Sequence, residues 1–390
     1  MSPSDILLSM SQLYLFNPEN DLSLAHGKAQ YTAPPNALHL HDAGAILPLW
    51  LCDENDKVIA DLKDIEWVSQ IKSLFDIKGD IATKSNIENV TKCCPWGWSL
   101  HAKKQLLNFG VDNSLLLTDA DIEEIRTLSH RRTSIEVLSN LNTYISFPDT
   151  TYPFEATNEN AVIDYARKHQ QIFIKSPWSS SGRGVINASN ISEQELRRRA
   201  GGIIRRQGSV ICEKALDKVI DFAMLFYSDG KKVEFLGFSS FFNEGTGAYA
   251  GNIIASQQTI FQSLNKFSVN IDLIELSQLM ERVLAFKING KYSGYLGVDM
   301  MIYRDKYGKH AVAPCIEVNM RMTMGVVALL WSEKHLFPSS IGVMRVEYKF
   351  HKKEFQKYNK DLPFIVDRKL KSGTISLIPP DDYFEITIKI

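Results

Sequence analysis

The chain has 390 residues, 44% of them hydrophobic and 23% charged, a composition typical of globular proteins with two or three domains. Its formal net charge of −1 gives no overall attraction to nucleic acid or to an anionic membrane, so neither is an expected partner. The N-terminus lacks the basic start of a signal peptide, and no apolar run reaches the ~18–20 residues that span a bilayer. We therefore expect a cytoplasmic protein whose five cysteines, which show no zinc-binding spacing, are reduced core thiols.

The first third of the chain alternates short apolar runs with polar loops, which predicts an α/β layer. Leu13–Phe16 is a buried-type strand, and the polar loop Asn17–Asp21 follows it. Ligands of open α/β sheets bind outside the carboxyl ends of the strands, which makes Glu19, Asn20 and Asp21 candidate substrate contacts. Capping or turn formation explains these residues equally well. No Gly-x-Gly-x-x-Gly follows the strand, so a dinucleotide-binding fingerprint is absent.

A helix is expected within 119–142, and the character of the chain changes after it. Gln171–Lys175 is predicted to be a strand, followed by a loop rich in serine and glycine, Ser176–Gly184. Backbone N–H groups and hydroxyls in such a loop can surround phosphate oxygens while Lys175 supplies a point charge. The loop is not a P-loop, because it lacks Gly-Lys-Ser/Thr and joins two strands. A mobile connection is the alternative interpretation.

A further candidate lies where the strand 209–213 leads into a charged turn. Backbone groups of Glu213–Leu216 could hold an adenine between apolar side chains, and the carboxylate of Asp221 could bind the ribose hydroxyls. An ordinary charged turn explains the same residues.

The segment Phe241–Asn252 is rich in glycine and aromatic residues. A loop that closes over a substrate needs such backbone freedom and a few polar groups, here Asn243, Tyr249 and Asn252. A disordered surface loop is the alternative.

The most informative pattern is the pentad Glu317-Val318-Asn319-Met320-Arg321. Alternate residues of a strand share a face, so a carboxylate, an amide and a guanidinium would point the same way. Hard oxygen ligands bind Mg²⁺, and a fixed cation beside them can meet a phosphate. A polar face on an edge strand is the alternative.

A hairpin is predicted to give this pentad a partner. The strands 295–303 and 311–317 flank a turn, and a hairpin symmetric about Gly308 would place Asp299 opposite Glu317. Like charges at such positions are destabilising unless something neutralises them. We therefore predict a Mg²⁺ ion with Asp299, Glu317 and Asn319 as ligands, in a register that a one-residue slip would destroy.

These motifs occur in an order that resembles the ATP-grasp superfamily over roughly residues 120–330. The strand 317–321 is similar to that of the biotin carboxylase and phosphoribosylaminoimidazole carboxylase branch. The resemblance implies an α/β fold, α+β in its nucleotide-binding part. It implies a pre-ATP-grasp domain over 1–118, an ATP-grasp domain over 119–340 with a lid subdomain at 148–215 and a metal-binding subdomain at 216–340, and a C-terminal extension over 341–390.

The resemblance also implies residue roles. Lys175 would contact the α- and β-phosphates, and Arg321 would stabilise the transferred phosphate. Asp299, Glu317 and Asn319 would hold Mg²⁺, with two ions expected and Mn²⁺ as a substitute. The remaining ATP contacts would come from Ser179, Ser180, Ser181, Gly182, Arg183 and Gly184 over the β- and γ-phosphates, Glu213, Lys214, Ala215 and Leu216 at adenine, and Asp221 at ribose.

One position departs from the family pattern. The family usually has an earlier lysine upstream of an Ile/Val-Pro turn, and the corresponding count back from Pro148 reaches Arg132. Arginine is always charged, but its planar fork differs from the point charge of a lysine. Arg132 is therefore a candidate phosphate contact, with a solvated helix start as the alternative.

The predicted activity is that of a Mg-ATP-dependent, ADP-forming ligase. It would activate the carboxylate of a small molecule or peptide as an acyl-phosphate and join it to an amine. A kinase that phosphorylates a hydroxyl, or a catalytically silent nucleotide-binding module, are the alternatives. The expected partners are the substrate and, in a homodimer, a second copy of the chain.

Overall fold

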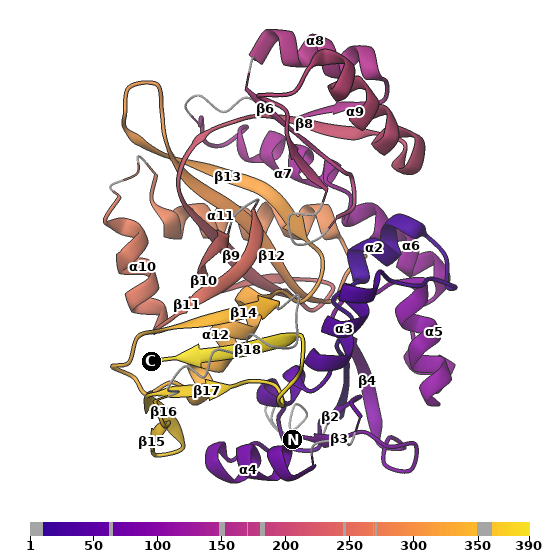
Figure 1. The fold of residues 1–390 in the computed structure, drawn as a ribbon, viewed down its shortest axis with the longest axis vertical. Helices are drawn as coiled ribbons and strands as arrows, with labels where there is room; N and C mark the ends of the chain where they lie inside the picture. The colour runs from indigo at the N-terminus through magenta and orange to yellow at the C-terminus, as the bar shows by residue number, and fades with distance from the viewer. Residues whose placement is uncertain are drawn as a thin grey trace. The chain divides into compact units, whose positions relative to one another are not determined.

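The computed structural model describes residues 11–61, 65–147, 153–169, 171–179, 184–244, 247–267, 269, 271–348 and 361–390 (Figure 1). Contacts divide the chain into two compact units, each discontinuous in sequence. The first unit contains Met1–Glu123, Ala250–Ile260 and Arg321–Ile390, and the second contains Glu124–Tyr249 and Phe261–Met320. The sequence predicts contiguous domains instead, and their functional limits stay a prediction.

The first unit begins with a parallel sheet in the order β3-β2-β1-β4. The apolar strand predicted at its start is confirmed, because Leu13 and Leu15 of β1 are buried. The strands are β1 (Ser11–Leu15), β2 (Lys57–Val58), β3 (Asp80–Ile81) and β4 (Val90–Pro95), and the helices are α2 (Asn20–His26), α3 (Pro35–Gly44), α4 (Ile65–Phe75) and α5 (Leu100–Phe109), with 3₁₀ turns at Leu47–Leu51 and Asn113–Leu115.

The same unit contains antiparallel strands in the order β11-β14-β18-β17. Its core includes the indole of Trp50, which packs against Trp331 at 6.3 Å between ring centroids and donates a hydrogen bond to the carbonyl of Leu377. The elements are β11 (Ala248–Ile254), α12 (Met324–His335), β14 (Gly342–Tyr348), β15 (Phe364–Val366), β16 (Lys369–Ser372), β17 (Thr374–Ser376) and β18 (Phe384–Lys389). Helix α6 (Asp119–Leu128) carries the chain into the second unit.

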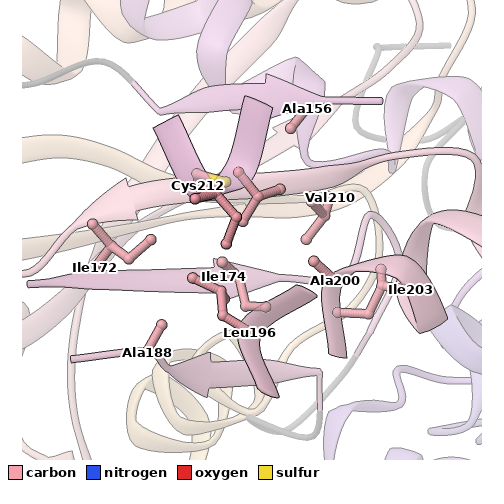
Figure 2. Close-up of a cluster of buried hydrophobic side chains, with 11 residues drawn as sticks. Ala156, Ile172, Ile174, Ala188, Leu196, Ala200, Ile203, Val210 and Cys212 are labelled. Carbon is pink, nitrogen blue, oxygen red and sulfur yellow. The ribbon is translucent and has the colours of Figure 1, made fainter. Parts of the chain in front are cut away.

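The second unit contains a small sheet in the order β5-β8-β6-β7, with two helices packed on it (Figure 1). Figure 2 shows the apolar side chains of strands and helices that meet in one cluster, among them Ile174, Leu196 and Cys212. The elements are β5 (Phe154–Ala156), α8 (Glu159–His169), β6 (Ile172–Lys175), β7 (Val185–Asn187), α9 (Glu193–Gln207) and β8 (Val210–Lys214).

This unit also contains antiparallel strands in the order β13-β12-β9-β10. Helix α11 packs on these strands and on α7, and α7 packs on β13. The elements are α7 (Arg132–Leu141), β9 (Asp217–Ser228), β10 (Val233–Glu244), α11 (Leu273–Ile288), β12 (Gly294–Arg304) and β13 (His310–Asn319). Helix α10 (Gln257–Asn265) begins in the first unit and ends in the second.

Two general expectations can be compared with the structure. All five cysteines are free, and all but Cys94 are buried. Within the described residues, no helix combines the length and the apolar character that crossing a membrane requires.

Candidate functional site

The hairpin of β12 and β13 places Asp299 directly opposite Glu317, the pairing that the sequence predicts. The amide nitrogen of Asn319 donates a hydrogen bond to Asp299 Oδ2 at 3.2 Å. The two carboxylates and the amide therefore gather on one strand pair of the second unit.

The register arises differently from the predicted one. Arg304 pairs with His310 at the turn, so the hairpin is centred one position before Gly308, and a bulge between Asp299 and Met301 then shifts the ladder. Pro314 explains the bulge, because proline cannot donate a ladder hydrogen bond and is tolerated in sheets only at edges and bulges. The bulge restores the predicted pairing of Asp299 with Glu317.

The guanidinium beside Glu317 belongs to Arg131 and not to Arg132. Arg131 Nη1 lies 2.6 Å from Glu317 Oε2, and its side chain is only 6% exposed. The side chain of Arg132 is 52% exposed and pairs with Glu155 at 2.5 Å. Successive residues at a helix start point about 100° apart, so a shift of one position in the sequence exchanges the arginine beside Glu317 for the one beside Glu155.

The first turn of α7 also fixes the backbone of the metal strand. The hydroxyl of Ser134 accepts a hydrogen bond from the buried N–H of Val318 at 3.1 Å. Together with the ion pair of Arg131, this contact holds the position of Glu317. Ser134 is not predicted from the sequence, because no local pattern indicates its contact with Val318.

The loop after β6 is tied to the same arginine. Arg131 Nε donates to the carbonyl of Ser176 at 3.0 Å, and Nη2 donates to the hydroxyl of Ser179 at 3.1 Å. The end of the loop approaches Ser179 so closely that only glycine fits at position 184, because a Cβ there would lie 2.5 Å from that of Ser179. The predicted contacts Ser180, Ser181, Gly182 and Arg183 lie outside the described residues.

Lys175 ends β6 and is buried. Its ammonium pairs with Glu213 Oε2 at 2.5 Å, across the neighbouring strand β8. The structure therefore brings the predicted phosphate lysine and a predicted adenine residue into direct contact.

A pocket opens beside this pair. The apolar residues that sequence reasoning missed come mostly from the bulged part of β13, where Pro314, Cys315 and Ile316 leave the ladder. Burial raises the pKa of the Cys315 thiol, which therefore stays protonated. The residues that line the pocket are Leu138, Pro153, Glu213, Lys214, Leu216, Ala313, Pro314, Cys315 and Ile316.

The other predicted nucleotide and loop residues are more scattered. The N–H of Ala215 donates to the carbonyl of Gln171 at 2.9 Å. Asp221 accepts hydrogen bonds from Asn243 at 3.0 Å and from Lys218 at 2.7 Å, and does not line the pocket. Tyr249 and Asn252 lie on β11, where Asn252 is fully buried, so these candidates belong to a strand and not to a loop.

The loop after β1 forms a second group of polar contacts, within the first unit. Asp21 accepts hydrogen bonds from Arg321 Nε at 3.0 and 2.9 Å, and its Oδ2 lies 2.7 Å from Nη2. Arg321 follows the end of β13 at Asn319, so it is not on the strand face that the alternation predicts. The buried Asn20 packs over Gly97, where any Cβ would lie 2.3 Å from Asn20 Nδ2.

Glu19 in the same loop is buried and faces a histidine. Its Oε2 lies 3.1 Å from His41 Nδ1. Burial alone would lower the pKa of His41, but the hydrogen bond and charge of Glu19, with the charge of Asp42, raise it above its usual value. Burial and the charge of Glu19 also raise the pKa of Tyr31. Nothing in the sequence around His41 indicates that Glu19 is its partner.

No protein-family model matches the chain, and no curated protein matches it. Among solved structures, the chain is similar to the biotin carboxylase of Campylobacter jejuni in a β,γ-ATP complex, with 11% identity, a TM-score of 0.51, and coverage of 97% of this chain and 86% of that one. It is also similar to the biotin carboxylase domain dimer of the Hydrogenobacter thermophilus 2-oxoglutarate carboxylase, solved with MgADP, ADP and bicarbonate. Here the identity is 11%, the TM-score 0.50, and the coverage again 97% and 86%.

Both neighbours belong to the ATP-grasp superfamily and align with nearly the whole chain. The predicted fold class is therefore confirmed: the chain has the ATP-grasp fold.

Proposed function

We propose that this chain with the ATP-grasp fold is an ATP-dependent ligase that activates a carboxylate as an acyl-phosphate and joins it to an amine. The observation that carries the proposal is the pairing of Asp299 with Glu317 on a hairpin that Arg131 connects to the loop after Lys175. Ligands for a cation and groups for a phosphate thus converge within one unit.

The residues of the hairpin fit a divalent cation. Two facing carboxylates carry two negative charges against the single positive charge of Arg131, and the side chain of Asn319 is positioned beside them. Carboxylate and amide oxygens are the hard donors that Mg²⁺ prefers. Asp299, Glu317 and Asn319 would hold the ion, which when bound would neutralise phosphate charge, and Mn²⁺ would be its substitute.

The groups around the hairpin fit a nucleotide. An adenine ring is proposed to lie against the apolar walls of this pocket, Leu216 and the bulged segment 314–316. Lys175 and Arg131 are buried cations fixed by Glu213 and Glu317, so little reorganisation is needed when they meet phosphate. We keep Lys175 as a phosphate contact and propose Arg131 in place of Arg132.

Positioning and charge neutralisation account for the chemistry, because phosphoryl transfer to a carboxylate needs no covalent help from the protein. The carboxylate oxygen of the substrate attacks the γ-phosphorus and ADP leaves; the amine then attacks the acyl carbon and phosphate leaves. Arg321 is proposed to stabilise the transferred phosphate. Its three contacts with Asp21 support this role, since they fix the orientation of its guanidinium.

The test is a screen of carboxylic acids paired with amines that measures ADP release, with mass spectrometry of the product. Formation of ADP, phosphate and an amide is the expected result, and hydroxylamine should trap the acyl-phosphate as a hydroxamate. A phosphate ester with no hydroxamate would identify a kinase. Nucleotide binding without ADP or AMP release across the panel would instead identify a silent binding module.

Two broader properties belong to the same proposal. The Hydrogenobacter neighbour is described as a dimer, which supports a homodimer here, testable by light scattering. We also propose that the protein works in the cytoplasm on a small molecule or peptide, a location that fractionation of cells would test.

A further inference from the structure

The guanidinium of Arg131 is fixed by several contacts at once. It is buried and makes contacts in three directions, to Glu317 Oε2 at 2.6 Å, to the carbonyl of Ser176 at 3.0 Å and to the hydroxyl of Ser179 at 3.1 Å. Arginine stays protonated in proteins, and its planar fork loses little freedom when several bonds form together. A permanent positive charge is therefore fixed beside one oxygen of Glu317.

This contact limits what Glu317 can offer to metal ions. A charge-assisted bond of 2.6 Å takes one lone pair of Oε2, and a divalent ion on the other lone pair of the same oxygen would lie close to the guanidinium and be repelled by its charge. Only Oε1 remains suitable for a metal. Glu317 is thus a poor bridge between two ions, which in two-metal sites lie ~3.5–4 Å apart and hold the attacking and leaving oxygens of the reaction.

The remaining donors are enough for one ion. Asp299 faces Glu317 across the hairpin, and the amide of Asn319 is adjacent. In the part of the chain that the structure describes, no group of three or more His, Cys, Asp and Glu side chains is placed to hold a metal. Mg²⁺ commonly takes one or two carboxylates and completes its shell with water and substrate phosphate, so this small set is adequate.

We propose that the site binds a single divalent cation with each nucleotide, and that the guanidinium of Arg131 takes the place of a second cation at Glu317. The inference rests on the proposed nucleotide binding and replaces the two ions expected from the family resemblance. Arg131 then fixes Glu317 and the loop after β6, in addition to its proposed contact with phosphate.

The experiment counts metal without measuring turnover. The full chain is dialysed to equilibrium against Mn²⁺ and a non-hydrolysable ATP analogue, and bound metal, nucleotide and protein are quantified by elemental analysis and absorbance. A ratio of one Mn²⁺ per bound nucleotide is expected. Two ions per nucleotide, or nucleotide bound without metal, would overturn this inference while leaving nucleotide binding intact. Failure to retain any nucleotide would overturn both this inference and the proposed function.

Variants test whether Arg131 is the cause. Arg131→Gln should raise the ratio towards two, and Arg131→Lys, which keeps a charge, should leave it at one. Arg132→Gln is the matched control and should also give one ion, since this neighbour pairs with Glu155 on the surface. An unchanged ratio in a folded Arg131→Gln would contradict the role of the arginine. If that variant does not fold, a ratio of two in Arg131→Lys would contradict it instead.

Discussion

The β12–β13 hairpin and the loop after β1 both hold a carboxylate by hydrogen bonds, but the bond between the two hairpin strands and the ion pair at the loop span very different lengths of chain. In the hairpin, Asn319 reaches Asp299 across 20 residues. In the loop, Asp21 holds Arg321 across 300 residues. The first kind of contact follows from a turn and two strands, whereas the second depends on the complete topology of its unit. The two regions should therefore respond differently to mutation.

The largest expected effect is on catalysis, at the hairpin. Glu317→Gln should lower kcat by ~10²–10³, the usual loss for one electrostatic stabiliser, because the metal loses a charged ligand. The fold should persist, since a glutamine oxygen can still accept the hydrogen bond of Arg131. ADP release with substrates from the screen measures the effect, and circular dichroism verifies folding. Turnover at the wild-type rate in this variant would remove Glu317 from the metal site.

A histidine beside the hairpin arginine gives the next largest effect, on stability. Burial and then the charge of Arg132 lower the pKa of His130 to about 4. Between pH 6.5, the ordinary pKa of histidine, and about pH 4, His130 is protonated in the unfolded chain but neutral in the folded chain. The free energy of unfolding should therefore fall as the pH drops through this window, by about 3 kcal/mol.

Urea unfolding at pH 6.5 and pH 4.5 measures this slope. His130→Gln serves as the comparison, because it keeps a polar side chain but cannot titrate. The variant should lose most of the pH dependence in this range. An identical slope in both proteins would show that other groups cause the acid sensitivity.

The hairpin is the part of the site that the sequence predicts best. Alternation and a turn were enough to pair Asp299 with Glu317, although the turn is centred one residue earlier and the bulge at Pro314 compensates. The count back from Pro148 reaches Arg132, whereas the arginine beside Glu317 is its neighbour Arg131, because sequence spacing does not resolve the 100° step between helix-start side chains. Local pattern thus identifies the element, and three-dimensional packing selects the side chain.

The partners of the loop after β1 are harder to predict, because they come from other segments of the chain. Its position after a strand indicated Glu19, Asn20 and Asp21, but nothing local indicates that Arg321 and His41 are their partners. Alternation in the pentad predicts Arg321 on the face of Glu317, but β13 ends at Asn319. Contacts between distant segments depend on topology, which a single sequence does not contain.

The long-range ion pair should contribute to stability as much as to function. Asp21→Asn should lower the free energy of unfolding by about 1.5–3 kcal/mol, the range for hydrogen bonds to charged groups, because Arg321 is only 15% exposed and loses its carboxylate. Urea denaturation measures the loss. The double variant Asp21→Asn with Arg321→Gln should recover part of it, since no buried charge is left alone. A larger loss in the double variant would show that the two effects are independent.

The smallest effect compares two histidines, one in each region, whose pKa values are shifted in opposite directions. The pKa of His41 is raised by Glu19 and Asp42 against the effect of burial. The ion pair of His41 and Glu19 therefore stabilises the fold fully below about pH 6.5, and this contribution is lost as the pH rises through the raised pKa. Imidazole resonances followed by NMR should show His41 still protonated at a pH where His130 is neutral.

Glu19→Gln should lower the pKa of His41, because burial then acts without its opposing carboxylate. If the variant leaves that pKa unchanged, Asp42 and not the buried Glu19 controls the charge of His41, and the loop after β1 would resemble the hairpin in depending on a neighbour close in sequence.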